Sequence, residues 1–323
     1  MLRTAFVLAI SSLVLSAGVA IADAPSPYRA VGAGTEIRGI VPTKAEAHAF
    51  AGKAGSGGNL TYHGGKVLLT NRTVAIFWQP TGSNMAAGYQ TTISKYLADV
   101  AHDSGSSNNV YSVLNQYYNA SNQHIAYSST NATSVIDTQS YPASGCSDTV
   151  SQTTICLSDA QLQAELQRLY STGKIDHDPN TTYFLFTAKN VGSCFNSSTC
   201  AFSYYCAYHS NVTLGGTVVQ YANQPYADTV PAACDAGYYP NGQSTEADAT
   251  INVTSHEHRE SINDPLGNAW YDRRGAEGSD KCAWNFGTVT GTGSSGYNQT
   301  INGDHYILQQ EWSNNGSTCK LHA

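Results

Sequence analysis

The sequence predicts a single α+β domain, built on a mixed β-sheet that is flanked by helices and cross-linked by disulfides. Three observations predict this fold. Short apolar runs typical of buried strands alternate with segments of helical spacing. A strong hairpin signal, Asn302-Gly303, lies near the C-terminus. Eight cysteines, all between Cys146 and Cys319, make an even set that suits disulfides in an exported chain.

The first residues have the pattern of a signal peptide covering residues 1–22. Arg3 supplies the positive charge, an apolar run from Ala5 to Val19 follows, and Ala20-Ile21-Ala22 matches an A-x-A cleavage site. The run is too short for a bilayer, and no later stretch reaches the length that a spanning helix needs. We therefore expect a secreted protein, extracellular or periplasmic, without a membrane span. Cleavage after Ala24 and an uncleaved anchor are the less favoured alternatives.

Residues 23–58 are rich in Ala, Gly and Pro and show little periodicity, which predicts a flexible leader or a short pro-segment. The folded domain is expected to cover residues 59–323, a length that suits one large core. Removal of residues 1–22 takes away one Arg and no acid, so the formal net charge changes from −7 to −8. An acidic chain of this kind is a poor match for nucleic acid.

The expected elements are strands, helices and one hairpin. Buried strands are predicted from short apolar runs at residues 74–78, 182–188 and 217–222. Helices are predicted from apolar spacing at residues 89–100, 110–118, 158–170 and 250–263. Ser158 is the expected N-cap of the third helix, and a Thr245–Asp248 capping box is expected to open the fourth. Asn302-Gly303 is expected to join strands at residues 297–301 and 305–312.

The cysteine spacing favours pairing between neighbours along the chain. Sequence alone leaves the connectivity of eight cysteines open. The even spacing of Cys194, Cys200 and Cys206 suggests a metal cluster, but it matches no zinc pattern that we recognise. We expect the disulfides Cys146–Cys156, Cys194–Cys200, Cys206–Cys234 and Cys282–Cys319.

The segment 255–265 carries the strongest chemical signal. His256 and Glu260 are four residues apart, so on a helix they share one face, with Glu257 on its flank. This is the spacing of the HExxH zinc helix, with Glu260 in place of the second histidine. An imidazole and a carboxylate one turn apart can both ligate a cation, and Glu257 can take a proton from water. Pro265 forces the helix to end by Asp264.

A third ligand is expected further along the chain. Asp280 lies twenty residues after Glu260, a spacing similar to that of gluzincin-type peptidases, in which a second helix supplies an acidic ligand. Glu277 would share the helical face of Asp280. Asp264 is a rival ligand, or a carboxylate that orients His256. Zinc is the favoured ion, with Mn²⁺ or Ca²⁺ as alternatives, because two carboxylates and one imidazole make a hard, anionic site.

A solvated surface helix is the alternative interpretation of the same segment. In that case His258, Arg259 and Glu260 are exposed, and Arg259 pairs with a neighbouring acid. Ile251 and Ile262 argue instead that the helix is at least half buried. Acids crowded near a buried helix end need a cation or a proton.

Two further histidines, His63 and His209, are candidate residues of the cleft. A lone histidine is more often structural than functional, so both are weaker candidates than the helix residues. The Gly291–Gly296 segment matches a dinucleotide fingerprint, but a polar hairpin rather than a helix follows it. We therefore reject a dinucleotide site.

Several of these pieces together resemble the phosphate-induced, or Exordium-like, family of secreted proteins. The resemblance runs from about residue 59 to the C-terminus. It is carried by Leu60–Gly65, Val74–Trp78, Cys206–Ser210, Ser255–Glu260 with Asp264-Pro265, Asn268–Tyr271, Asp280–Cys282, and Asn302-Gly303 through Trp312 and Cys319. It implies an extracellular or cell-wall location, and plant members of the family are linked to growth responses. Some members lack the His-Glu pair, so catalysis here must be argued from the retained residues.

The first functional hypothesis is a secreted zinc-dependent hydrolase, most simply a metallopeptidase. His256, Glu260 and Asp280 would hold the metal, and Glu257 would be the general base. The alternative is a non-catalytic extracellular or cell-wall binding protein with a structural ion, which would have no use for a base beside the ligands. A glycosidase with paired carboxylates is a third possibility, but it leaves His256 unexplained. We expect a monomer that acts on a peptide or cell-wall substrate.

Overall fold

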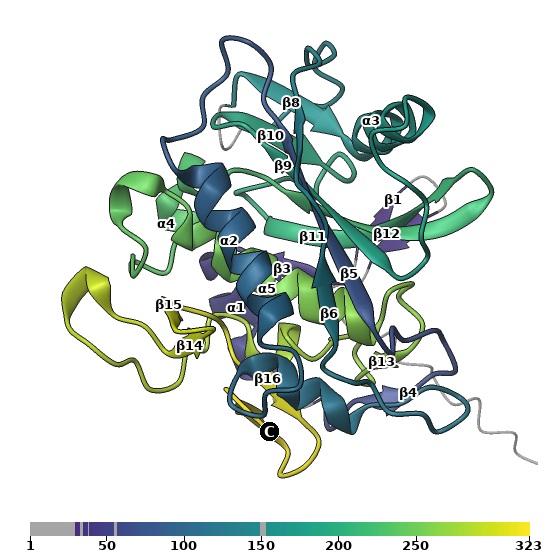
Figure 1. The fold of residues 1–323 in the computed structure, drawn as a ribbon, viewed down its shortest axis with the longest axis vertical. Helices are drawn as coiled ribbons and strands as arrows, with labels where there is room; N and C mark the ends of the chain where they lie inside the picture. Colours follow the sequence, from purple (N-terminus) through teal and green to yellow (C-terminus); the bar gives the residue numbers. More distant parts are fainter. Residues whose placement is uncertain (1–29, 33–34, 38, 55–56, 149–152) are drawn as a thin grey trace, which may run out of the picture.

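The computed structural model describes residues 30–32, 35–37, 39–54, 57–148 and 153–323. The predicted signal peptide, residues 1–22, lies outside the described residues. In the described part of the chain, no helix is long and apolar enough to cross a membrane. The chain folds as a mixed α+β structure, as the sequence predicts (Figure 1).

Short strands and helices alternate along the chain. The strands are β1 Ala30–Gly32, β2 Thr35–Ile37, β3 Ile40–Pro42, β4 Thr61–Tyr62, β5 Asn71–Trp78, β6 Ser129–Asn131, β7 Val135–Asp137, β8 Ile155–Ser158, β9 Thr181–Thr187, β10 Val191–Cys194, β11 Tyr205–Leu214, β12 Thr217–Gln224, β13 Trp270–Tyr271, β14 Gln299–Ile301, β15 Asp304–Tyr306, β16 Glu311–Ser313 and β17 Thr318–Lys320. The α-helices are α1 Lys44–Ala54, α2 Tyr89–His102, α3 Asp159–Ser171, α4 Pro231–Cys234 and α5 Asp248–Asn263. The 3-10 helices are η1 Val110–Gln116, η2 Ala227–Thr229, η3 Gln243–Thr245, η4 Asp280–Cys282 and η5 Gly293–Ser295.

A seven-stranded sheet forms the centre of the fold, in the order β3-β11-β12-β9-β5-β6, with β7 also paired to β5. The strands from β12 to β6 run parallel to their neighbours, whereas β11 pairs antiparallel with both β12 and β3. The sheet is therefore mixed. Every residue of β9 is buried, which explains why its sequence is a nearly continuous apolar and β-branched run.

Alternation along β11 shows which helices cover which face of the sheet. Tyr208 donates a hydrogen bond to Asp159, at the start of α3, over 2.6 Å. The next residue, His209, points the other way, with Nδ1 3.0 Å from Oε2 of Glu257 on α5. Because successive side chains of a strand point to opposite faces, α3 and α5 pack on opposite sides of the sheet. Helix α2 lies against α5.

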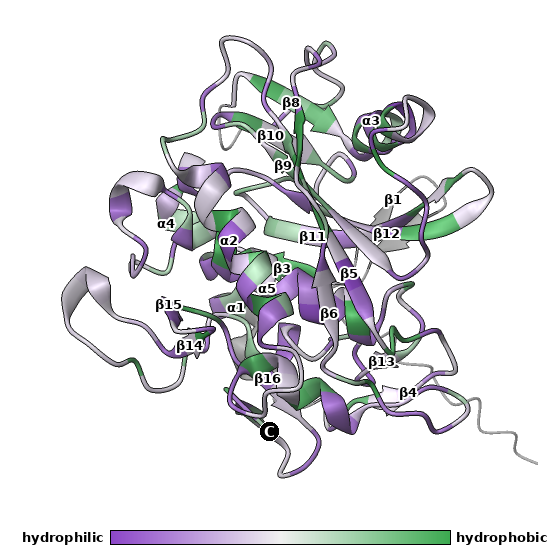
Figure 2. Cartoon of the chain, viewed as in Figure 1, coloured by the Kyte–Doolittle hydropathy of each residue, from purple (hydrophilic) through white to green (hydrophobic). Residues whose placement is uncertain are grey.

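Helix α5 is buried along its whole length, although most of its residues are polar. Figure 2 shows hydrophilic and hydrophobic residues side by side on this central helix. The interpretation as a solvated surface helix is therefore wrong. The polar side chains have partners inside the protein instead, as in the ion pair of Arg259 Nε with Glu311 Oε2 at 2.9 Å. Arg259 thus pairs with an acid, but in the core.

His258 is a structural histidine of α5. Its Nε2 lies 2.9 Å from Oδ1 of Asn71, which can only accept, so Nε2 carries the hydrogen. Its Nδ1 lies 3.0 Å from the Tyr111 hydroxyl, which can donate to it. Burial, and then the charge of Arg259, lower the pKa of His258 to about 3, so the ring is neutral.

Several boundaries differ from the sequence prediction. The predicted capping box is wrong: the N-cap of α5 is Ala247, and the Asp248 carboxylate accepts hydrogen bonds from Asn241. Residues 110–116 form a 3-10 helix instead of an α-helix. The hairpin forms around Asn302-Gly303, but residue 312 belongs to β16, which pairs with β17. The Ser158 capping box on α3 is present as expected, with Gln161 as its second member.

The segment predicted as a flexible leader or pro-segment, residues 23–58, contains regular structure where it is described. Strands β1, β2 and β3 and helix α1 lie in it, and β3 is the edge strand of the central sheet. Ile40 and Val41 are fully buried, and this apolar pair explains why β3 docks. Strand β3 and helix α1 are therefore regular elements in a segment whose sequence shows little periodicity, whereas its flexibility and its removal as a pro-segment stay predictions.

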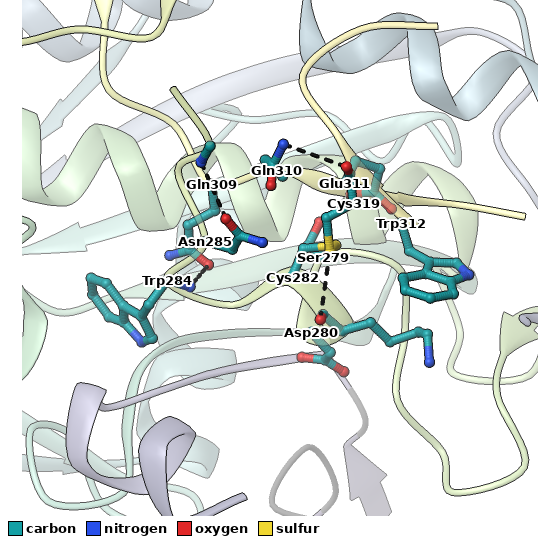
Figure 3. The surroundings of a disulfide bond; sticks show 12 residues. Ser279, Asp280, Cys282, Trp284, Asn285, Gln309, Gln310, Glu311, Trp312 and Cys319 are labelled. Atoms are coloured by element: carbon teal, nitrogen blue, oxygen red, sulfur yellow. Dashed lines mark hydrogen bonds between the residues drawn. A yellow bond between two sulfur atoms is a disulfide. The ribbon is translucent and has the colours of Figure 1, made fainter. Parts of the chain in front are cut away.

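The four disulfides join the expected neighbours, Cys146–Cys156, Cys194–Cys200, Cys206–Cys234 and Cys282–Cys319. The last of them ties η4 to the C-terminal strand β17. Figure 3 shows this disulfide beside the segment that runs from Gln309 to Trp312. It therefore fixes the short helix that carries Asp280.

Candidate metal centre

A buried cluster of acidic and histidine side chains forms around α5. His256 and Glu260 lie one helical turn apart, and Glu257 follows His256. Asp280, the first residue of η4, contacts His256, and His209, on β11, contacts Glu257. All five side chains are at most 3% exposed. Three elements that are distant in sequence thus meet in one buried place.

Three atoms of the cluster form a group with the dimensions of a zinc site. His256 Nε2 lies 3.2 Å from Glu260 Oε1 and 3.4 Å from Asp280 Oδ1. One possible ligand atom from each of the three residues lies within 4.8 Å of the other two. Ligands of a tetrahedral zinc ion, each about 2.0–2.2 Å from it, are about 3.3–3.6 Å apart. The structure therefore brings together the three residues that the sequence nominates as ligands.

Gln309 determines which nitrogen of His256 carries hydrogen. The Oε1 atom of Gln309 accepts the backbone N–H of Trp284 over 3.0 Å, so this oxygen, not the amide nitrogen, also faces Nδ1 of His256 at 3.0 Å. Nδ1 must then be the donor, which leaves Nε2 of the neutral ring as an acceptor. Nε2 has no hydrogen-bond partner among the described residues. It faces two carboxylate oxygens, an arrangement that needs a cation or a proton.

Backbone N–H groups orient the two carboxylates. The N–H of Asp280 donates to Oε1 of Glu260 over 2.9 Å, and the N–H of Glu277 donates to Oδ2 of Asp280 over 2.9 Å. Oδ1 of Asp280 is left without a hydrogen bond within the described part of the chain. Such contacts hold ligand side chains in place before an ion arrives.

His209 lies beside this group of three residues. Its Nε2 lies 3.3 Å from the carbonyl oxygen of Asp264, which can only accept, so Nε2 carries a hydrogen. Its Nδ1 is 3.0 Å from Glu257 Oε2 and 3.9 Å from Glu260 Oε2. Burial lowers the pKa of His209, but the hydrogen bond to Glu257 and the nearby carboxylates outweigh it, so the pKa is raised. His209, Glu257 and Glu260 are also a second group that could hold an ion.

The cluster holds more acids than bases. Burial first, and then repulsion from neighbouring carboxylates, raise the pKa values of Glu277 and Asp280 well above their usual range. Burial works against protonation of His256, but Glu260 and Asp280 together raise its pKa well above the ordinary value. The cluster is thus built to hold positive charge, either as protons or as a cation that replaces them.

The remaining predicted residues have other contacts than those expected. Asp264 Oδ1 accepts the N–H groups of Asn268 and Ala269 over 2.6 Å each, and Gln309 instead contacts His256 Nδ1. Glu277 precedes η4, so it shares no helical face with Asp280. His63 is exposed and stacks on Tyr271 at 3.6 Å between ring centroids, outside the buried cluster.

Sequence reasoning missed two contributors, Gln309 and the backbone of β3. Gln309 is a polar residue after a hairpin, and no spacing rule connects it to His256. The N–H of Val41 donates to Glu257 over 3.2 Å, and the N–H of Gly39 donates to Glu277 over 3.1 Å. Nearly every residue has a backbone N–H, so residue types could not have predicted these two contacts.

Comparisons with models of protein families, with curated proteins and with solved structures found no match for this chain. The interpretation of the site therefore depends on its own geometry and chemistry.

Proposed function

We propose that this chain is a secreted metal-dependent hydrolase, most simply a metallopeptidase, with one divalent cation held by His256, Glu260 and Asp280. One observation carries the proposal: the buried Nε2 atom of His256 lies 3.2 and 3.4 Å from two carboxylate oxygens, with its other nitrogen committed to Gln309. Zinc fits best, because the spacing is that of a tetrahedral ion. Mn²⁺ or Ca²⁺ is the alternative for a carboxylate-rich set.

Glu257 is the proposed general base. A bound divalent ion would polarise a substrate carbonyl and make water more acidic. Glu257 directly follows one ligand in sequence, and its carboxylate lies in the same group as Glu260. Its Oε2 faces Nδ1 of His209 at 3.0 Å, a contact that orients the carboxylate. Geometry of this kind is what general-base catalysis needs.

Secretion and the substrate class are part of the proposal. Four disulfides suit an oxidising compartment, and they support export by the predicted signal peptide. A peptide is the favoured substrate, and a cell-wall polymer is the alternative. The Exordium-like resemblance agrees with an extracellular location.

A structural ion in a non-catalytic extracellular protein is the second candidate function. Complete burial favours it, because the side chains of His256, Glu257 and Glu260 are at most 1% exposed. A catalytic ion needs a path for the substrate, so this candidate gains if the cluster stays closed under all conditions.

Metal content and peptide hydrolysis together test the proposal. Purified protein should hold close to one divalent ion per chain, and His256→Ala should lose it. The exposed His63→Ala variant is the matched control and should keep the ion. Turnover of a proteome-derived peptide library should be measured for the full chain and for a chain without the residues before Asn59.

Two outcomes would contradict the proposal. Absence of a bound ion, or equal loss in His256→Ala and His63→Ala, refutes the metal centre. An ion bound to a protein that cuts no peptide in either form refutes the hydrolase and leaves the structural ion.

A further inference from the structure

Strand β3 lies directly on the proposed metal centre. It pairs antiparallel with β11, and the N–H of His209 donates to the carbonyl oxygen of Gly39 over 3.1 Å. The N–H groups of Gly39 and Val41 donate to the side chains of Glu277 and Glu257. One extended segment thus joins the edge of the sheet to two carboxylates of the cluster.

Where this segment comes closest to His209 and Glu260, there is room for its backbone but for no side chain. A Cβ atom at Gly39 would lie 1.8 Å from Cε1 of His209 and 3.0 Å from Oε2 of Glu260. A glycine is therefore required for this approach to the proposed ligands. A backbone that adds to the free edge of a sheet is the way in which many proteins bind an extended peptide, because main-chain hydrogen bonds supply the affinity.

The position of β3 also blocks the proposed chemistry. Glu257 Oε1 accepts from Val41, and Glu257 Oε2 faces His209, so both oxygens are engaged. The cluster is closed to solvent while β3 is in place. Two further hydrogen bonds fix the end of the strand. The N–H of Thr43 donates to the Tyr204 carbonyl, and Nε1 of Trp284 donates to the Pro42 carbonyl.

We infer that the groove beside β11, now filled by residues 39–43, is the binding site for an extended polypeptide substrate that runs antiparallel to β11. Residues 39–43 fill this groove as an internal substitute for substrate and hold the enzyme inactive. Release of the chain before Asn59 opens it. The inference rests on the proposed function, because only a hydrolase would treat the bound peptide as a substrate. Peptide binding itself can be measured without catalysis.

Peptide binding to an opened form is the main test. A recognition sequence for a site-specific protease is inserted between Gly58 and Asn59, which are both exposed. The cut protein is separated from its N-terminal segment by gel filtration. The probe is a fluorescent peptide with the sequence of residues 36–44. We expect saturable binding to the opened form and none to the uncut chain, because β3 occupies the site in the latter.

Two variant peptides test the binding mode. A peptide with Gly39→Val should bind at least about tenfold more weakly, because its side chain would collide with His209. A peptide with Lys44→Arg is the control and should bind as well as the parent. Equal affinity for the Gly39→Val and parent peptides would overturn the proposed pose.

A matched pair of full-length variants tests the blockade without cutting the chain. Val41→Pro removes the N–H that binds Glu257, whereas Val41→Ala shortens the side chain and keeps the N–H. Turnover should rise in the order wild type, Val41→Ala, Val41→Pro, and the opened form should exceed the uncut chain by at least about tenfold.

Several results would overturn the inference. An opened form that unfolds, or that stays folded and binds no peptide, makes β3 an ordinary structural strand. Equal turnover before and after opening would also show that β3 is an ordinary structural strand, but it would not contradict the proposed hydrolase. Conversely, peptide binding by an opened form that holds no metal would refute the metal-dependent hydrolase but would support the groove as a peptide-binding site.

Discussion

Nδ1 of His256 lies 3.0 Å from Oε1 of Gln309, and that oxygen also accepts the backbone N–H of Trp284. This pair fixes the tautomer of the histidine and points Nε2 at Glu260 and Asp280. Arg259 secures the arrangement, because its guanidinium donates to the carbonyl oxygen of Gln309 over 3.1 Å. Gln309 is therefore a positioning residue, and its effect on the ion can be measured.

Gln309→Ala should weaken metal binding by about 10–100-fold, the usual effect of losing a partner that orients a ligand. The variant leaves all three proposed ligands intact, so it should still bind an ion at high concentration. Competition with a chromophoric chelator measures the affinity. Gln310→Ala is the control, since its side chain instead donates to the Cys319 carbonyl. Equal affinities in the two variants would show that Gln309 has no orienting role.

Removal of the Cys282–Cys319 disulfide should weaken metal binding as well as folding. The bond ties η4, and with it Asp280, to β17 (Figure 3). The double variant with serine at both positions should lose about 2–4 kcal/mol of unfolding free energy, because the unfolded chain gains freedom. The matched control replaces Cys146 and Cys156, a disulfide outside the centre. The control variant should lose stability and keep its metal affinity. An equal loss of metal affinity in the two double variants would contradict the role assigned to Cys282–Cys319.

Metal binding should release protons and weaken as the pH falls. Burial and repulsion raise the pKa values of Glu277 and Asp280, so these carboxyls keep their protons to a higher pH than ordinary carboxyls when no cation is bound. A divalent cation displaces those protons, and acid therefore competes with it. Calorimetric titration of the ion-free protein in buffers of different ionisation enthalpy counts the protons. Binding with no proton release would show that the carboxyls are already ionised.

Helix α5 was predictable because its proposed site residues are close together in the sequence. The spacing of His256 and Glu260 places them on one face whatever the rest of the chain does. The approach of Asp280 to Glu260 was expected from spacing too, and the helix that carries Asp280 is the short 3-10 helix η4. The capping box was wrong because Asn241, from the preceding turn, binds the Asp248 carboxylate.

The long-range parts of the structure were not predictable in the same way. Strand β11 is missing from the prediction, because His209, Ser210 and Asn211 interrupt its apolar pattern. These polar residues are tolerated because the strand pairs on both sides and His209 finds carboxylates on α5. The docking of β3 was also missed, since its contacts to the cluster come from backbone N–H groups. Composition marked the segment only as rich in Ala, Gly and Pro.

A pH-dependent stability change should arise far from the metal centre, at Glu165 on α3. Burial first raises the pKa of Glu165 to about 7; Arg168 opposes this shift and Asp137 adds to it. Between pH 4.5 and 7 the folded chain holds a proton that the unfolded chain has lost, so stability falls as the pH rises through this window. Glu165→Gln cannot ionise. It should match the wild type near the acidic end of the window and exceed it above pH 7 by about 1–3 kcal/mol.

Urea unfolding at a series of pH values measures this difference. Parallel profiles for the wild type and Glu165→Gln would show that Glu165 is ionised in the folded protein throughout the range.

Two amide substitutions on neighbouring turns of α5 should separate the base from the ligand. Glu257→Gln keeps the volume and the acceptor oxygen of the side chain but removes its basicity. Metal content and thermal stability should hardly change, whereas peptide hydrolysis by the opened form should fall by about 10²–10⁴-fold, the usual contribution of a general base. Glu260→Gln should lose metal and hydrolysis together, because Oε1 of Glu260 lies 3.2 Å from Nε2 of His256 in the proposed ligand set. Metal and turnover must be measured on the same preparations, since each alone leaves base and ligand indistinguishable. If Glu257→Gln loses metal as readily as Glu260→Gln, then Glu257 is itself a ligand, and the ion occupies the group formed with His209 instead.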